Sequence, residues 1–444
     1  MSSFVILVCL LALLISIIKE KNIYNPVTIF STFWGVIVFL ASLRLYNLYE
    51  ISEYTYQILL TAFLSYYFGF VFLRLIKPLK KDINNLVGKD NYVLNYNFLY
   101  ILYGFTIIYL LFCVYNVIQL MQNGYSMPEI RRIYFSIGEK TVSPIFLFIN
   151  TYIIKTLEYV FSVICFVDFF GGQKRKSLLL LTITVVILSS IVNGGRLIYY
   201  RFVIDAVIAL LIYKDIYNSS YRGAVRIVIC IVSFALIGMF ILTKLRNTSI
   251  NTLYVYFAGC IPHLNYRIEL IKSTGIRTYG AGFFGGFLRP FFMVLDNIGL
   301  LSYPQTYLNY MSIIRTNVEQ YVLIGDGVYY NAFVTPFFYF YLDFGVIGVV
   351  LGSAFYGAIC SLSYITIKNK PNIKNISIYV LLVQEIFTSM IRWQLNTEAY
   401  FLAFVLLFTF VFKRKQSDNC FCLLLSALKT KLNKIFETRL CKKK

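Results

Sequence analysis

The chain has 444 residues, 59% of them apolar and 14% charged, and its formal net charge is +21. This composition excludes an ordinary soluble globular protein, because apolar runs of about 18 residues or more recur along the chain. The cations stand at the ends of these runs, where they orient membrane helices and meet anionic lipid. They therefore indicate a lipid bilayer as a partner and argue against nucleic acid. We predict an all-α polytopic membrane protein.

Apolar runs of about 15 to 24 residues predict eleven transmembrane helices. They are expected at residues 3–18, 27–43, 54–76, 97–120, 145–167, 177–192, 197–213, 224–243, 335–367, 376–391 and 399–412. The first run lacks a preceding positive segment and an Ala-x-Ala-type exit, which favours a retained span over a cleaved signal. The run at 335–367 is longer than a bilayer requires, which predicts a tilted helix or a re-entrant piece.

The basic residues between the runs predict the orientation. Of the 41 Lys and Arg residues, 26 lie on one side of the membrane if that side contains segments 19–26, 74–96, 168–177, 214–226, 368–375 and 413–444. The positive-inside rule makes that side cytoplasmic, with the N-terminus outside and the C-terminus inside. Residues 413–444 form a predicted basic amphipathic tail, with helical spacing from 421 to 440 that suits either a membrane anchor or a partner-binding element.

Two loops fall on the opposite, outer side. The first eight helices, within residues 1–243, are interrupted by a small outer loop at 121–144 with Arg131, Arg132 and Lys140. A large outer loop at 244–334, before the last three helices at 335–412, carries Arg246, Arg267, Arg277, Arg289 and Arg315. Five guanidinium groups suit a ligand with phosphate oxygens, so we predict a partly helical, substrate-facing domain. The alternative is a solvated loop held at anionic headgroups.

Charged residues also interrupt the predicted spans, where an unpaired charge costs about 2.5 to 3.5 kcal/mol. Three pairs share a helix face and either neutralise each other or act directly: Lys155 with Glu158, Arg201 with Asp205, and Glu385 with Arg392. Arg196 has no acid nearby in sequence and follows Asn193, Gly194 and Gly195 at an outer hairpin. It either meets a lipid-borne diphosphate or extends to the headgroups.

Several segments carry a family likeness. They are an Asn-Pro and Trp-bearing span, NPVTIFSTFWGVIVFLASLRLY; a Gly-Arg hairpin, VNGGRLIYYRFVI; two outer-loop segments, YVYFAGCIPHLNYRIE and YGAGFFGGFLRPFF; and an Asn followed by Asp-x-Gly in GDGVYYNAFVTPFFYFYLDFGVIGVV. Together they resemble the Wzy-type oligosaccharide repeat-unit polymerases of bacteria, which build O-antigen and capsular polysaccharide. The chain departs from the Arg-x10-Gly spacing of some members, because nine residues separate Arg315 from Gly325 and eleven separate it from Gly327.

The resemblance implies a GT-C-like membrane glycosyltransferase of the bacterial cytoplasmic (inner) membrane. Such enzymes transfer a growing glycan from undecaprenyl diphosphate to the next lipid-linked repeat unit on the outer face. The implied partners are undecaprenyl-diphosphate-linked oligosaccharide as donor and acceptor, the bilayer, and a chain-length-regulating co-polymerase. Asn331 and Asp343 match the family's Asn and Asp-x-Gly and join the substrate-binding set by that resemblance.

Transfer from a lipid diphosphate needs cations for the leaving group and a base for the acceptor hydroxyl. We predict that the diphosphate is bound by Arg196, Arg277, Arg289 and Arg315. The predicted base is His263, the only histidine, or Asp326, which lies between two glycines. An ordinary loop histidine and a turn-forming aspartate are the alternatives. The long loop has no Asp-x-Asp pair, so neither a metal ion nor another cofactor is expected.

Two other functions stay open on the sequence alone. A glycan ligase has a similar layout with a different acceptor, and a lipid-linked oligosaccharide flippase or transporter is the leading non-enzyme alternative. Transporters commonly show internal repeats and short loops, and this sequence shows neither. The nine cysteines suggest no disulfide framework and no zinc site, because most lie in apolar segments and the chain has a single histidine.

Overall fold

Almost every apolar run of the chain forms a helix. The computed structural model describes residues 1–77, 92–127, 129–130, 144–171, 175–217, 222–245, 252–331 and 333–414, and a helix lies within each of the eleven ranges predicted as spans. Helices are expected there because in an apolar medium they satisfy their own backbone hydrogen-bonding groups. The predicted all-α class is therefore confirmed for the part of the chain that the structure describes.

The first half contains helices α1 (Ser2–Glu20), α2 (Pro26–Ser42), α3 (Glu53–Ile76), α4 (Tyr96–Gln122), α6 (Pro144–Phe148), α7 (Lys155–Phe170), α8 (Lys176–Asn193), α9 (Leu197–Tyr217) and α10 (Arg222–Leu245). The second half contains α11 (Thr252–Ala258), α12 (Cys260–Thr274), α13 (Ala281–Asn297), α14 (Gln305–Glu319), α15 (Thr335–Asn369), α16 (Ile373–Thr388) and α17 (Glu398–Thr409). Short 3-10 or π turns occur at η1 (Leu45–Asn47), η2 (Ile149–Ile154) and η3 (Gln394–Asn396). Two antiparallel strand pairs join β1 (Tyr92–Leu94) to β4 (Phe412–Arg414), and β2 (Val322–Gly325) to β3 (Val328–Tyr330).

Six helices among the described residues are long and apolar enough to cross a bilayer. They are α1, α3, α4, α8, α10 and α15. Helices α2 and α17 are apolar but shorter, with 17 and 12 residues. These lengths and compositions indicate a membrane-embedded, multi-pass protein.

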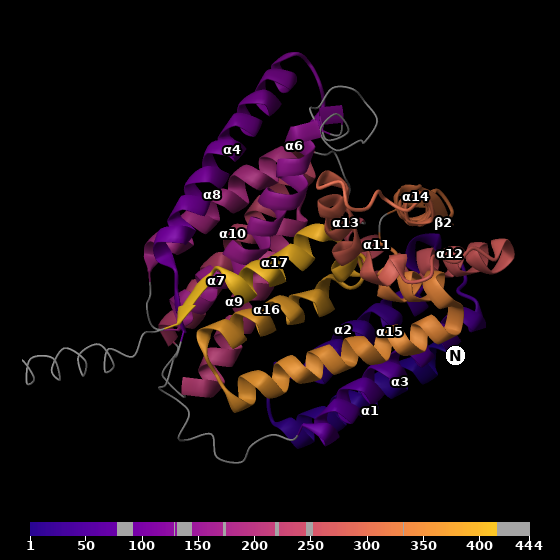
Figure 1. The fold of residues 1–444 in the computed structure, drawn as a ribbon. Helices are drawn as coiled ribbons and strands as arrows, with labels where there is room; N and C mark the ends of the chain where they lie inside the picture. Colours follow the sequence, from indigo (N-terminus) through magenta and orange to yellow (C-terminus); the bar gives the residue numbers. More distant parts are fainter. Residues whose placement is uncertain are drawn as a thin grey trace, which may run out of the picture.

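The helices lie side by side, and the segments between them gather at two opposite ends of the bundle (Figure 1). At one end are α11 to α14 with β2, all from the predicted large outer loop. They contact the ends of α2 and α3: Tyr49 donates a backbone hydrogen bond to the Ile324 carbonyl at 2.9 Å, and Ser52 donates to the Asn265 side chain at 2.6 Å. The described part of the predicted outer loop is thus a mostly helical cap on the bundle.

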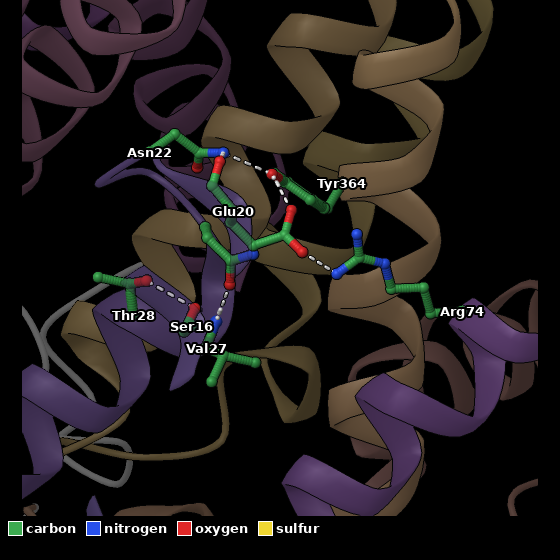
Figure 2. Close-up of polar contacts among 8 residues, drawn as sticks. Ser16, Glu20, Asn22, Val27, Thr28, Arg74 and Tyr364 are labelled. Atoms are coloured by element: carbon green, nitrogen blue, oxygen red, sulfur yellow. Dashed lines mark hydrogen bonds and ion pairs between the residues drawn. The ribbon is translucent and has the colours of Figure 1, made fainter. Parts of the chain in front are cut away.

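The opposite end holds the basic segments that the sequence placed on one side. Figure 2 shows Arg74, at the end of α3, paired with Glu20, at the end of α1. Tyr364 of α15 donates to Glu20 at 3.0 Å and accepts a hydrogen bond from Asn22 at 2.7 Å. Three helices therefore end in one polar cluster, as predicted for segments 19–26 and 74–96.

The other basic segments lie at the same end. Asp215, near the end of α9, accepts hydrogen bonds from Tyr24 and, at 2.8 Å, from Lys368. Strand β1 pairs with β4, and the Arg175 guanidinium lies 3.6 Å from the centre of the Tyr96 ring. The structure thus brings together parts of all six segments that the charge pattern grouped.

The overlong predicted span at 335–367 is one kinked helix. Within α15, Phe344 and Gly345 leave helical geometry, and Gly345 has a φ of 62° that a side chain would strain. The kink divides a short segment at the cap from a longer one in the bundle.

Some sequence predictions concern residues that the structure does not describe. They are Arg131, Arg132, Lys140 and Arg246 and the predicted tail helix at 421–440.

Helices α3 and α15 pack closely because small residues face each other. A Cβ atom on Gly69 would lie 1.9 Å from the Ala354 carbonyl oxygen, and one on Gly357 would lie 2.0 Å from the Tyr66 carbonyl oxygen. Close backbone approach at glycine is a common means of packing helices within a bilayer. This helix pair is a rigid part of the bundle beneath the cap.

Replacing Gly69 with alanine is expected to destabilise the bundle by about 1 to 3 kcal/mol, because the added methyl group overpacks the contact. Gly104→Ala in α4 is the matched control, since a Cβ there has no atom within 4 Å. Thermal unfolding of the purified protein in detergent would show a lowered midpoint for Gly69→Ala alone. Equal midpoints for the two variants would contradict this packing.

Candidate functional site

His263 lies in the core of the cap. It is in α12, fully buried, and its Nδ1 donates to the Phe333 carbonyl at 2.9 Å, while its Nε2 accepts a hydrogen bond from Arg267 Nε at 3.1 Å. Burial is the main cause that lowers the pKa of His263 to about 4. Both ring nitrogens are occupied, so the predicted role as general base is not supported by this geometry.

Arg267 completes the same buried link. Its guanidinium also donates to the Gln320 carbonyl at 2.8 Å, which joins α12 to the end of α14, and only 1% of the residue is exposed. A phosphate ligand could not reach it. Among the outer-loop arginines, Arg267 therefore stabilises the cap and does not bind a ligand.

Asp343 is also a structural residue. Its carboxylate in α15 accepts hydrogen bonds from Thr278 Oγ1 at 2.5 Å, Gly282 N at 2.9 Å and Phe283 N at 2.7 Å. These amides belong to the first turn of α13, so Asp343 caps that helix from a distant part of the chain. It is 1% exposed, which does not support the substrate contact that the resemblance implied.

Asp326 lies in the turn of the β2–β3 hairpin, and Asn331 directly follows β3. Asp326 is exposed at its turn, where its backbone amide donates to the Asn47 carbonyl at 3.1 Å, just beyond α2. Asn331 is half-buried and donates to the Glu319 carbonyl at 3.2 Å. Of the two predicted bases, His263 is buried and Asp326 is exposed, so only Asp326 is accessible to a ligand.

Two of the predicted diphosphate-binding arginines have carboxylate partners. Arg289 of α13 pairs with Glu398 at the start of α17, and Arg315 pairs with Glu319 at 3.3 Å on the exposed face of α14. Arg277 is near the α15 kink, 5.4 Å from the centre of the Tyr341 ring, and donates to the Ile276 carbonyl at 2.8 Å. No contact among the described residues brings Arg277, Arg289 and Arg315 together at one site in the cap.

Arg196 is held differently. Gly194 ends α8 with a φ of 55°, and the chain turns directly into α9, which places Arg196 at the turn. Its guanidinium donates to Thr243 Oγ1 at 2.8 Å and to the Tyr256 hydroxyl at 2.7 Å, and lies 4.9 Å from the centre of the Tyr256 ring. No carboxylate lies within ion-pair distance among the described residues, so its charge is oriented but not neutralised.

An apolar groove of about 300 Å³ runs along α2. Its walls are Ile23, Thr28, Ile29, Thr32, Phe33, Val36, Ile37, Phe257 and Phe387. The face from Thr28 to Ile37 rises about 14 Å along the helix, roughly half of a bilayer's hydrocarbon core. A groove of this shape suits part of an extended hydrocarbon chain.

Two short links join the groove to Arg196, which is not itself one of its lining residues. Phe257, which lines it, follows the Tyr256 that holds the guanidinium. Tyr200, one turn after Arg196 on α9, donates to the carbonyl of Phe387, another groove residue, at 3.2 Å. A cation that no carboxylate pairs with among the described residues is thus linked through Tyr256 and Tyr200 to an apolar groove, and this combination suits an anionic lipid.

A second group of charges lies inside the bundle. The Arg201 guanidinium is 4.2 Å from the centre of the Tyr159 ring. Asp205 accepts hydrogen bonds from Ser162 at 2.5 Å and from Gln384 at 2.8 Å, and Glu385 accepts one from the Gln394 amide at 3.0 Å. The described residues contain no direct ion pair between Arg201 and Asp205 or between Glu385 and Arg392, so the first of the two alternatives does not take that form for these pairs.

Sequence reasoning missed the neutral partners that replace those ion pairs. Ser162 and Gln384 looked like ordinary polar residues within apolar runs, and only their place on facing helices could have identified them.

Among the described residues, no group of three or more His, Cys, Asp or Glu side chains could hold a metal ion. No protein-family model, curated protein or solved structure matches the chain.

Because His263 is buried neutral, acidification is expected to destabilise the cap. Its folded pKa of about 4 lies below the ordinary value of 6.5, so the unfolded chain binds more protons as the pH falls through 6.5. Between pH 7 and pH 5 the loss should be about 2 kcal/mol. Unfolding measured at both pH values should show this loss in the native protein, and His263→Gln should abolish it. A pH-independent native stability would refute the assignment.

Proposed function

We propose that the chain is a membrane glycosyltransferase that polymerises undecaprenyl-diphosphate-linked oligosaccharide repeat units into O-antigen or capsular polysaccharide. It would act without a metal on the outer face of a bacterial cytoplasmic membrane, with eleven spans in a GT-C-like arrangement. The proposal joins the family resemblance of the sequence segments to the groove described above. Its partners would be the lipid-linked donor and acceptor, and a chain-length-regulating co-polymerase.

The single observation that carries the proposal is the link between the apolar groove and Arg196, through Tyr256 and Tyr200. A lipid diphosphate has an isoprenoid tail that favours an apolar surface and a polyanionic head that favours guanidinium. The groove walls would hold part of the tail, and Arg196 would hold the head. Thr243 and Tyr256 fix the guanidinium before a ligand binds, which lowers the entropy lost on binding.

Arg196 would contribute most when the bond between sugar and diphosphate breaks. The acceptor hydroxyl attacks the anomeric carbon of the donor, the new glycosidic bond forms, and undecaprenyl diphosphate leaves with the bonding electron pair. The leaving diphosphate gains negative charge, which a fixed guanidinium stabilises. The hydroxyl proton passes to a base, for which Asp326 is the candidate, because it is exposed near the end of α2.

Two other functions would use the same groove. A ligase would transfer the glycan to a different acceptor, and a flippase would move the lipid-linked oligosaccharide without breaking a bond. The ordered cap of α11 to α14 favours an enzyme over a flippase, because it covers the end of the bundle at which Arg196 lies. In cells, loss of a polymerase leaves one repeat unit on each acceptor, whereas loss of a ligase leaves none.

Arg196→Gln is expected to lower polymer formation by about 100-fold, because one guanidinium contact to the leaving group is lost. The assay incubates purified protein with a lipid-linked repeat unit, without metal or nucleotide sugar, and separates the products by length. Arg44→Gln is the matched control, since Arg44 follows the end of α2 at the cap side of the bundle but is exposed and paired with Glu50. An undiminished ladder from Arg196→Gln would reject this role.

Filling the groove should weaken lipid binding without touching Arg196. Thr32→Trp places a large ring in the groove and is expected to raise the KM for the lipid-linked repeat unit. Leu64→Trp in α3 is the control, because Leu64 is exposed on the outside of the bundle. Initial rates measured across substrate concentrations in nanodiscs would separate the two variants, and an unchanged KM for Thr32→Trp would exclude the groove as the tail site.

A further inference from the structure

Helix α13 carries a continuous apolar stripe on its exposed side. The stripe consists of Phe284, Phe287, Phe291, Val294, Ile298 and Leu301, of which the last two follow the helix. Steps of three and four residues put the first four on one face of α13, Ile298 and Leu301 lie just beyond its end, and each of the six is between 43% and 59% exposed. No charged residue interrupts the stripe, although α13 belongs to the region predicted as an outer aqueous loop.

The opposite side of α13 is fixed against the bundle. A Cβ atom on Gly286 would lie 2.3 Å from the Leu395 carbonyl oxygen, so the helix backbone contacts the α16–α17 connection directly. Trp393 donates to the Phe283 carbonyl at 3.1 Å, and Asn396 donates to the Ala281 carbonyl at 3.1 Å. The stripe therefore cannot turn inward to bury itself.

The charges of α13 lie off the stripe. Arg289 faces α17, where it pairs with Glu398, and Asp296 is in the last turn. This distribution, with apolar residues on one face and charges elsewhere, is typical of helices that lie at a membrane interface. It is not expected of a helix that is surrounded by water on its exposed side.

The stripe continues the lipid-facing surface of two bundle helices. The Phe283 ring, beside the stripe, lies 5.4 Å from the Phe355 ring of α15, and the Phe287 ring lies 5.5 Å from the Phe401 ring of α17. Helix α15 is long and apolar enough to cross a bilayer and exposes Phe355 and Leu351 on its outside. One apolar surface thus extends from the bundle onto α13.

We propose that α13 is inserted in the outer apolar layer of the bilayer, with the stripe in contact with acyl chains. The region between α10 and α15 is then not wholly aqueous, and α13 anchors the cap to the membrane. Each apolar side chain of the stripe is stabilised when it leaves water for acyl chains. An exposed stripe of this size is otherwise rare on a protein surface in water.

The test places a tryptophan on the stripe and measures which quencher reaches it. Phe291→Trp and Val294→Trp are made in the full chain, and the fluorescence of the native protein, whose Trp34 and Trp393 are buried, is subtracted. Tyr321→Trp is the matched control, because Tyr321 is 70% exposed after α14. The variants are reconstituted in nanodiscs of phosphatidylcholine with or without bromine on the acyl chains, and acrylamide is the aqueous quencher.

Brominated lipid should quench most of the added fluorescence of both stripe variants and leave that of Tyr321→Trp unchanged. Acrylamide should quench Tyr321→Trp and leave most of the fluorescence of the stripe variants. Quenching of the stripe variants by acrylamide, as for the control, would overturn the proposal. Protection from both quenchers would overturn it too, because a protein surface would then cover the stripe. Two stripe positions are used so that one poorly folded variant does not prevent the measurement.

Discussion

The cap depends on the carboxylate of Asp343, which accepts three hydrogen bonds from the segment that begins α13. The kink at Gly345 follows directly in α15, so the helix that carries this carboxylate changes direction just below it. A buried carboxylate is costly unless it is hydrogen-bonded, and here the amides of a helix start provide those bonds. Asp343 therefore fixes α13, and through α13 the position of Arg289 beside Glu398.

The sequence predicted the helices well because each apolar run carries its own signal. Length and hydropathy are local properties, and so is the grouping of Lys and Arg between runs. That grouping put the segments of Arg74 and Glu20, and those of Lys368 and Asp215, on one side, and the structure brings these residues into contact. The kink in α15 was only partly predictable. The excess length of the run was visible, but the apolar pattern does not show where the helix bends, and the non-helical geometry at Phe344 and Gly345 appears only in the structure.

The roles of individual polar residues could not be predicted in the same way. His263 and Asp343 resembled site residues because they are rare, charged or polar groups in a family-like segment. Their partners, Phe333 for His263 and Thr278 for Asp343, are 70 and 65 residues away. A sequence shows which groups need a partner, but only the fold shows whether the chain supplies one. The partner of Asp205 could not be predicted for the same reason, because Gln384, which donates a hydrogen bond to it, comes from a facing helix.

This difference gives a physical criterion for choosing among the arginines. A cation whose charge is already matched by a carboxylate, as in Arg289 or Arg315, attracts a phosphate less strongly, because the nearby negative charge opposes the second anion. Arg196 is held by two hydroxyl groups, which orient it and leave its charge available. Beside an apolar groove, such a cation favours a ligand that is both lipid and anion, and it disfavours either a free sugar or a neutral lipid. The groove and the guanidinium together select an anionic lipid, because neither of them alone would distinguish it from these other ligands.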